Sequence, residues 1–290
     1  EISCSLVGSE MCIRDRQSTV PGTAEQPFVV TDGLFDQTKT ESDLGLSKIE
    51  GAETVTVFTA TDDTDHYCNG VVMTEFKGKL YTQWQSSAKD EDAEDTWVAY
   101  SVSDDNGATW SEPKVLVPTI DNGYCSSGGW FVSGDTLVSY INVWYSDTTP
   151  RGGFAYYVES TDGEHWSEMK PVLMKDGTPM EGIIEQDPHV LASGRIVNAA
   201  HFQPGLFAYP IYTDDPSGTK GWVKAQYTCM EQSKGATTSR EMEPSLFVNE
   251  DGTIVMTFRD QKSSFVRLAA ISTDQGETSV SYTHLTLPTK

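Results

Sequence analysis

Apolar and polar stretches alternate between residues 71 and 258 in a pattern that repeats four times. In each copy an apolar run leads into a glycine, and a second apolar run of five residues follows it. Short apolar runs on either side of a glycine are typical of two strands joined by a tight turn. The glycines Gly78, Gly134, Gly194 and Gly252 lie 56, 60 and 58 residues apart, so the pattern predicts one hairpin per repeat. The paired runs are residues 71–76 and 80–84, 130–132 and 137–141, 190–192 and 196–200, and 246–248 and 254–258.

A short turn motif follows each hairpin at nearly constant distance. Its fullest copy, residues 103–110, reads SDDNGATW, and three less regular copies begin at Ser160, Thr213 and Ser272, so successive starts lie 57, 53 and 59 residues apart. The aspartate can accept hydrogen bonds from backbone amides of the turn, the glycine supplies a positive φ, and the tryptophan offers a large apolar surface to bury. We call this motif the Asp turn and interpret it as structural; a calcium loop is the alternative for the paired aspartates of the first copy.

The two periodicities together predict the fold. Each repeat holds a strand, a tight turn, a strand, a longer loop, a strand, an Asp turn and a fourth strand, which describes a four-stranded antiparallel blade. Residues 17–278, at about 57 residues per repeat, hold four to five such blades. Blades cannot bury their faces alone, so they are expected to stack around an axis as a β-propeller.

Both ends of the chain depart from the repeat. Residues 1–16 and 279–290 resemble translated sequencing-adaptor read-through, and Ser279 stands where the other Asp turns place an aromatic residue. We therefore expect the two ends to be foreign to the propeller, to pack poorly and to form at most incidental strands.

Composition narrows the classes of partner. The net charge of −23 makes nucleic acid an unsuitable partner and repels polyanions at long range, so an anionic ligand needs a local basic pocket. No apolar run is long enough to span a bilayer, which argues against a membrane partner. Cys68, Cys125 and Cys229 show neither a disulfide framework nor a metal-binding spacing. We expect no cofactor and no metal.

Asp turns placed between the third and fourth strands of successive blades resemble the signature of the sialidase-like (BNR/Asp-box) β-propellers. The resemblance covers residues 63–278 and implies an all-β propeller of four-stranded antiparallel blades, here truncated to about four to five blades. It further implies a carbohydrate-active, exo-sialidase-like glycoside hydrolase that acts on acidic glycans in an extracellular or periplasmic location. Two alternatives stay open: a uronate-directed polysaccharide lyase on the same propeller, and a glycan-binding propeller without catalysis.

Strand alternation places the working surface. The hairpin glycines and the Asp turns share one face, so the ends of the second strands and the starts of the first strands gather on the opposite face, which we call the funnel face. Convergent polar groups in a concave site are the usual form of a sugar pocket. The candidate substrate-binding residues are Arg259, Gln85, Asn142, Tyr67, Tyr124 and His66, and the candidate catalytic residues are Glu243, His201 and Asp187, with Glu185 as a further acid.

Two of these residues occupy positions with a role in the family. By the resemblance, Glu243 corresponds to the glutamate that polarises a nucleophilic tyrosine, and Arg259 to the second arginine of a carboxylate-binding triad. The first triad arginine belongs to an Arg-Ile-Pro motif, whereas residues 66–69 read HYCN. The tyrosine nucleophile and the third arginine would fall in further blades, so this part alone is expected to be inactive. By the same resemblance, the family's general acid lies in the loop that corresponds to residues 89–95; a solvated acidic rim is the other interpretation of this loop.

Overall fold

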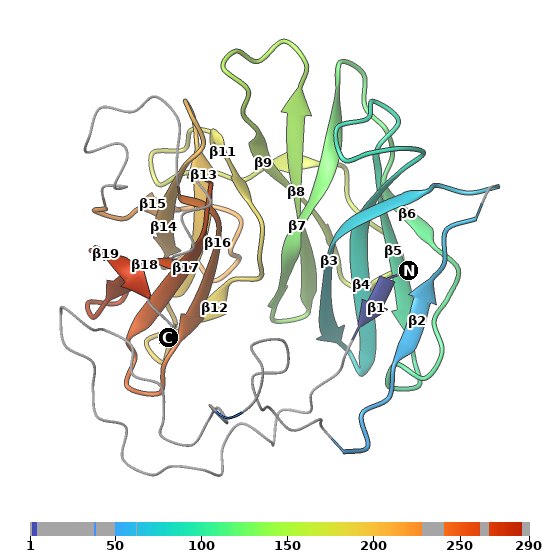
Figure 1. Ribbon diagram of the computed structural model, residues 1–290, viewed down its shortest axis with the longest axis horizontal. Coiled ribbons are helices and arrows are strands. Elements are labelled where there is room, and N and C mark those ends of the chain that lie inside the picture. The colour runs from blue at the N-terminus through green and yellow to red at the C-terminus, as the bar shows by residue number, and fades with distance from the viewer. Residues whose placement is uncertain are drawn as a thin grey trace.

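The computed structural model describes residues 2–4, 38, 50–61, 63–227, 241–261 and 267–285 (Figure 1). Within these ranges the chain is all-β, with nineteen strands and no helix, and hence no helix long and apolar enough to cross a membrane. Four antiparallel sheets form four blades, which confirms the predicted propeller of four-stranded antiparallel blades. Blade 1 consists of β3 (Tyr67–Phe76), β4 (Lys79–Ser87), β5 (Trp97–Ser103) and β6 (Lys114–Val117), and blade 2 of β7 (Gly123–Ser133), β8 (Thr136–Tyr145), β9 (Phe154–Ser160) and β10 (Lys170–Pro171). Blade 3 consists of β11 (Gly182–Ile184), β12 (His189–Val190), β13 (Ile196–Phe202), β14 (Phe207–Thr213) and β15 (Val223–Lys224), and blade 4 of β16 (Glu241–Val248), β17 (Ile254–Asp260), β18 (Arg267–Ser272) and β19 (Val280–Leu285).

Strands follow one another across each sheet in chain order, as the alternating runs and turns predict. In blade 3 the first strand is divided, because β11 and β12 both pair with β13. In Figure 1 the hairpins between the first and second strands of blades 1 and 2 lie at the lower edge, and the loops between their second and third strands rise at the top. The upper edge of these blades therefore belongs to the funnel face.

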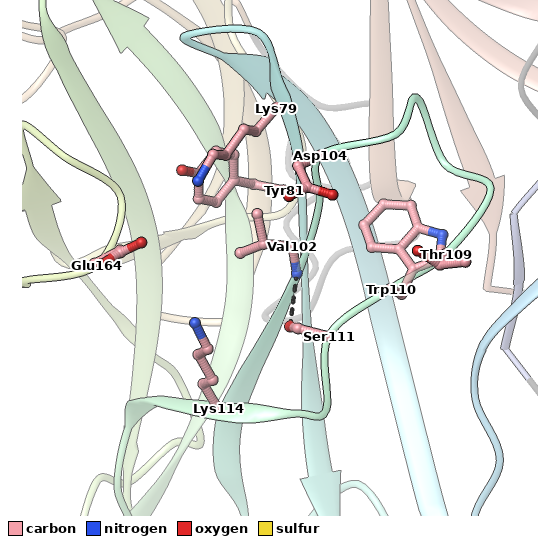
Figure 2. Close-up of a pocket in the computed structure, with 9 residues that line it drawn as sticks. All are labelled: Lys79, Tyr81, Val102, Asp104, Thr109, Trp110, Ser111, Lys114 and Glu164. Carbon is pink, nitrogen blue, oxygen red and sulfur yellow. Dashed lines mark hydrogen bonds between the residues drawn. The ribbon is translucent and has the colours of Figure 1, made fainter.

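The Asp turns are built as the motif predicts. Asp105 accepts hydrogen bonds from the Thr109 hydroxyl at 2.6 Å, and from the Thr109 amide and the Ser103 hydroxyl at 2.8 Å, and these bonds lower the pKa of its carboxyl. A difference concerns the tryptophans, which we expected to be buried: the tryptophan of the third turn is fully buried, whereas Trp110 and Trp166 are only half-buried. Trp110 lies on the rim of a shallow depression of about 320 Å³, where the amines of Lys79 and Lys114 also lie (Figure 2). Its ring therefore keeps one side toward solvent.

The Asp turns of blades 2 and 3 also pack closely against the blade before them. A Cβ atom on Gly163 would lie 2.1 Å from the Tyr81 hydroxyl of blade 1, and one on Gly218 would lie 2.7 Å from the Phe131 ring of blade 2. Both glycines also have positive φ values, 74° and 66°. Glycine is required here twice, by the backbone conformation and by the close approach of the neighbouring blade.

A second set of links joins consecutive blades on the same face. In each case a side chain from the hairpin between the first and second strands donates a hydrogen bond to a backbone carbonyl within the Asp turn of the next blade. These bonds fix the angle between blades, in addition to the apolar core that fills the space between facing sheets. The pairs are Lys77 with Thr161 (2.8 Å), Ser133 with Pro216 (2.8 Å) and Arg195 with Gln275 (3.4 Å).

The described segments near the chain ends also form strands. Strand β1 (Ile2–Cys4) pairs with β2 (Val55–Phe58), and the ring of Phe58 stacks on the buried Trp84 of blade 1 at 6.0 Å. Strand β19 is the outermost strand of blade 4, so this sheet extends past residue 278, the boundary expected from the sequence. The expectation that residues 1–16 and 279–290 are foreign sequence stays a prediction.

Candidate functional site on the funnel face

The register of the four sheets places the predicted second-strand residues at equivalent positions. Gln85, Asn142, His201 and Arg259 each lie near the end of the second strand, directly across the ladder from the first strand of the same blade. These equivalent positions differ in exposure. Gln85, Asn142 and His201 are buried (6%, 1% and 1% exposed), whereas the Arg259 side chain is 52% exposed. The ladder partners are Asn69 for Gln85, Ser126 for Asn142, Ile183 for His201 and Met242 for Arg259.

Arg259 and Glu243 meet across the first two strands of blade 4, as the sequence predicts. The Arg259 Nη1 donates a hydrogen bond to Glu243, and its Nη2 donates to the Gln261 side chain at 2.8 Å. Glu243 sits at an interruption of the ladder with a φ of 47°, and about half of each side chain is exposed. These two bonds fix the guanidinium of Arg259, which still faces solvent with N–H donors that can bind a carboxylate.

His201 and Glu185 form the neighbouring part of the site, in blade 3. His201 Nε2 lies 3.2 Å from Glu185 Oε2, and the imidazole is 1% exposed. Burial lowers the pKa of His201 to about 4, so the ring is neutral at pH 7. The pKa of Glu185 rises to about 7, first because its carboxyl is surrounded by protein although 32% of the side chain is accessible, and second because Glu243 is close, while Arg259 opposes the shift. Glu185 therefore carries a proton part of the time at neutral pH.

Asp187 has a different environment from the one we expected. Its carboxylate accepts a hydrogen bond from the Trp130 amide of blade 2 at 2.6 Å, and burial raises its pKa to about 6. It also lines a central cavity of about 280 Å³, together with Glu185 and residues of β3 and β16. Glu185, which lines the same cavity, lies 3.2 Å from His201, whereas the lining of this cavity includes neither His201 nor Arg259. Asp187 joins blade 3 to blade 2.

Asn142 and Gln85 are likewise engaged by the protein. The Asn142 amide both donates to the Ile184 carbonyl at 2.7 Å and accepts from the Ile184 amide at 2.9 Å, so it clamps the first strand of blade 3. Gln85 donates to the backbone carbonyl of Glu91 at 3.3 Å. Both side chains position the walls of the funnel.

Tyr67 and Tyr124 contact the acidic loop, residues 89–95. The hydroxyl of Tyr67 donates to Glu91 at 3.3 Å, and that of Tyr124 donates to Asp92 at 2.7 Å. Burial, with the nearby carboxylates, raises the pKa of both phenols, which therefore stay protonated. His66 is exposed just before β3, and no hydrogen bond to its ring is recorded within the described ranges.

A further group on this face was missed by sequence reasoning. Arg151, in the loop between β8 and β9, donates hydrogen bonds to Asp92 and Tyr124, and its guanidinium carbon lies 5.2 Å from the centre of the Trp144 ring. The loop has no position in the repeat, so no periodicity indicated it. An arginine six residues after a strand-end aromatic pair, Trp144-Tyr145, was the one available signal.

The described residues contain no group of three or more His, Cys, Asp or Glu side chains arranged to hold a metal ion. The described side chains of the funnel face include guanidinium donors, the partly protonated carboxyl of Glu185, and phenols. Such groups bind and orient polar ligands by hydrogen bonds and can transfer protons.

Four Asp-turn blades and a funnel face with an arginine paired to a glutamate define a β-propeller of the sialidase type. The chain belongs to the family of the BNR repeat-like domain, whose model matches residues 78–289. No curated protein matches the chain significantly.

Solved structures with the same fold include three bacterial or microbial proteins. A protein of unknown function from Dyadobacter fermentans is 14% identical over 77% of this chain and 70% of its own, with a TM-score of 0.61. A Hadza microbial sialidase is 17% identical over 78% of this chain and 48% of its own (TM-score 0.59). The intramolecular trans-sialidase of Ruminococcus gnavus, solved with oseltamivir carboxylate, is 14% identical over 80% and 73% (TM-score 0.59). At these identities the likeness shows the fold, and this chain spans about half of the Hadza sialidase.

Proposed function

We propose that this chain is the acidic-sugar-binding part of a sialidase-type glycoside hydrolase. Arg259 binds the carboxylate of the sugar, Glu243 orients Arg259, and Glu185 serves as the group that exchanges a proton with the substrate. By the family likeness, the protein would meet its glycan in an extracellular or periplasmic setting.

The observation that carries the proposal is the neighbourhood of Glu185. A carboxyl whose pKa is about 7 lies beside a glutamate that is paired with an exposed arginine. A general acid or base works best when its pKa is near the working pH. Arg259 bonds directly to Glu243, whereas Glu185 lies beside this pair and next to His201.

The lyase alternative has less support. It requires His201 to remove a proton from the sugar, yet the imidazole is 1% exposed and lies behind Glu185. A base must come within hydrogen-bond distance of the proton it removes, and His201 would need a large rearrangement to do so.

Binding without turnover is the second candidate for this chain by itself. A retaining mechanism of the sialidase type uses a tyrosine nucleophile, and the funnel phenols that the structure describes, Tyr67 and Tyr124, have raised pKa values. A protonated phenol is a poor nucleophile. We therefore expect the 290-residue chain to bind acidic sugars more readily than it cleaves them.

The test measures binding and turnover together. N-acetylneuraminic acid and glucuronic acid are titrated calorimetrically into the wild-type chain, with galactose as the neutral reference, and a fluorogenic sialoside reports turnover. The variant Arg259→Ala should weaken acidic-sugar binding by about tenfold or more, because a charge-assisted pair contributes roughly 1.5–3 kcal/mol. Lys170→Ala is the matched control, since Lys170 is an exposed cation paired with Glu159 at 2.7 Å on an outer strand. Equal binding by wild type and Arg259→Ala would reject the site, and turnover by the chain would reject binding alone.

A further inference from the structure

Arg151 is held in one orientation on the funnel face. Its Nη2 donates to both Asp92 and the Tyr124 hydroxyl, and its guanidinium lies over the Trp144 ring. The Tyr124 and Trp144 rings stack at 6.1 Å with an interplanar angle of 12°, and the Trp144 Nε1 donates to Ser126 at 3.0 Å. We call Arg151, Asp92, Tyr124 and Trp144 the Arg151 stack. An arginine fixed by a ring, a phenol and a carboxylate loses little further freedom when it binds a ligand.

The same arginine keeps unused donors. Its side chain is 60% exposed, and within the described ranges all its recorded hydrogen bonds use Nη2. A guanidinium has five N–H donors, so those on Nε and Nη1 are available to an acceptor from solution. The stack is thus a fixed hydrogen-bond donor at the boundary between blades 1 and 2.

The surrounding charge selects the kind of acceptor. Asp92 already neutralises Arg151, and the acidic loop to which it belongs holds five carboxylates and one lysine in residues 89–95. The loop of Arg151 adds Asp147. Charges within a Debye length of about 8–10 Å act on a ligand at this position, so an anion is repelled while a neutral hydroxyl or amide oxygen is not.

We propose that the Arg151 stack is a subsite for an uncharged sugar, which accepts hydrogen bonds from Arg151 through its hydroxyl or acetamido oxygens. The idea that the ligand is a glycan rests on the proposed function, and it deepens that function: Arg259 takes the acidic sugar, and Arg151 takes a neutral unit of the glycan. Exposed polar donors on a rigid aromatic support are a usual means of fixing a sugar's orientation.

Galactose and galacturonate test the subsite, because the two sugars differ only in the group at C6. The Nε–H resonance of Arg151 in the 290-residue chain reports binding at this position directly. We expect galactose to shift this resonance at low and high salt alike, and to bind here about fivefold or more tightly than galacturonate, because the acidic loop repels the anion. Tighter binding of galacturonate at this resonance, or no shift with galactose, would overturn the proposal.

Variants separate the subsite from a merely structural role. Calorimetry measures galactose binding in the variants, because Arg151→Ala removes the reporting resonance. Arg151→Ala should weaken galactose binding by about tenfold, since the fixed donors are lost, while Lys170→Ala should leave it unchanged. Lys170 is a close control, because it too pairs with a carboxylate, at 2.7 Å, and lies over an aromatic ring in blade 2. Asp92→Asn removes one negative charge and keeps an acceptor oxygen, so galacturonate should gain affinity at the Arg151 resonance.

The outcomes are also distinct from those for the proposed function. Arg259→Ala should weaken acidic sugars and leave the galactose shift of Arg151 intact. Unchanged galactose binding in a folded Arg151→Ala chain would remove the subsite and leave the Arg259 site standing. Galactose binding at Arg151 in a chain that binds no acidic sugar would leave the subsite standing and reject the Arg259 site.

Discussion

A substitution of Asn142 tests most clearly whether a strand-end polar residue has a structural or a ligand-binding role. The sequence places it at the funnel face as a substrate contact, whereas the structure buries it to 1% exposure, with two hydrogen bonds to the backbone of Ile184 at 2.7 and 2.9 Å. Asn142→Ala removes both bonds and leaves a buried amide and carbonyl without their partner. Each unsatisfied group costs about 1–3 kcal/mol, so we expect a loss of about 3 kcal/mol in the free energy of unfolding.

Urea unfolding and thermal melting measure this loss. At about 2–4 °C per kcal/mol for a chain of this size, the melting temperature should fall by roughly 6–12 °C. Hydrogen exchange adds a local readout, because the Ile184 amide loses its acceptor and should exchange faster than its neighbours in β11. The control is Gln85→Ala at the equivalent position of blade 1, where one bond of 3.3 Å is lost and about 1 kcal/mol is expected. A change below 1 kcal/mol for Asn142→Ala, together with weaker sugar binding, would refute the reasoning and restore Asn142 as a ligand contact.

Two further predictions concern the blade links and the titration of the site. Gly163→Ala should lower the free energy of unfolding by more than about 2 kcal/mol. A positive φ costs an alanine about 1 kcal/mol, and the new Cβ would lie 2.1 Å from the Tyr81 hydroxyl. Gly78→Ala is the control in the same urea titration: with a φ of 75° and nothing within 4 Å of its new Cβ, it should show the backbone cost alone. The pKa of Glu185 in the fold, about 7, exceeds its ordinary 4.5, so the stability from this carboxyl is full below pH 4.5 and is lost as the pH rises to 7. Glu185→Gln should therefore melt like wild type at pH 4.5 and at a higher temperature at pH 8, and a difference that does not change with pH would contradict the assigned titration.

The fold could be predicted because it depends on local patterns that repeat. A glycine between two apolar runs specifies a hairpin wherever it occurs, and the Asp turn carries its own hydrogen-bond acceptors, as Asp105 shows with its bonds to Ser103 and Thr109. Four copies of each signal fix the strand order and the face on which the turns lie. What the patterns do not contain is the contact between blades, such as Tyr81 against Gly163, which depends on how two sheets stack.

The site could be predicted in part. The closeness of Arg259 and Glu243 follows from the order of the strands, since both residues lie at the same end of one hairpin. The exact register does not predict the contact, because Arg259 lies across the ladder from Met242 and Glu243 lies in the bulge beside it. Arg151 could not be found in this way, because it lies in a loop whose path follows from its contacts with Asp92 and Trp144 rather than from any repeat. The sequence repeat predicts where strands end on the funnel face. Side chains from loops reach the same face from positions that follow no repeat.

Burial explains why equivalent strand ends differ in what they can do. A polar residue at the end of a second strand can form its hydrogen bonds with the next blade or with solvent. Burying a polar group without a hydrogen-bond partner lowers the stability of the fold. Asn142 uses the backbone of the next blade, and His201 lies behind Glu185, so neither presents its polar atoms to a ligand. Arg259 alone of the four positions keeps half of its side chain exposed in the described structure. If function on this face follows exposure rather than position, Arg259→Ala will reduce acidic-sugar binding with little effect on melting temperature, whereas Asn142→Ala will lower the melting temperature and spare binding in the molecules that remain folded.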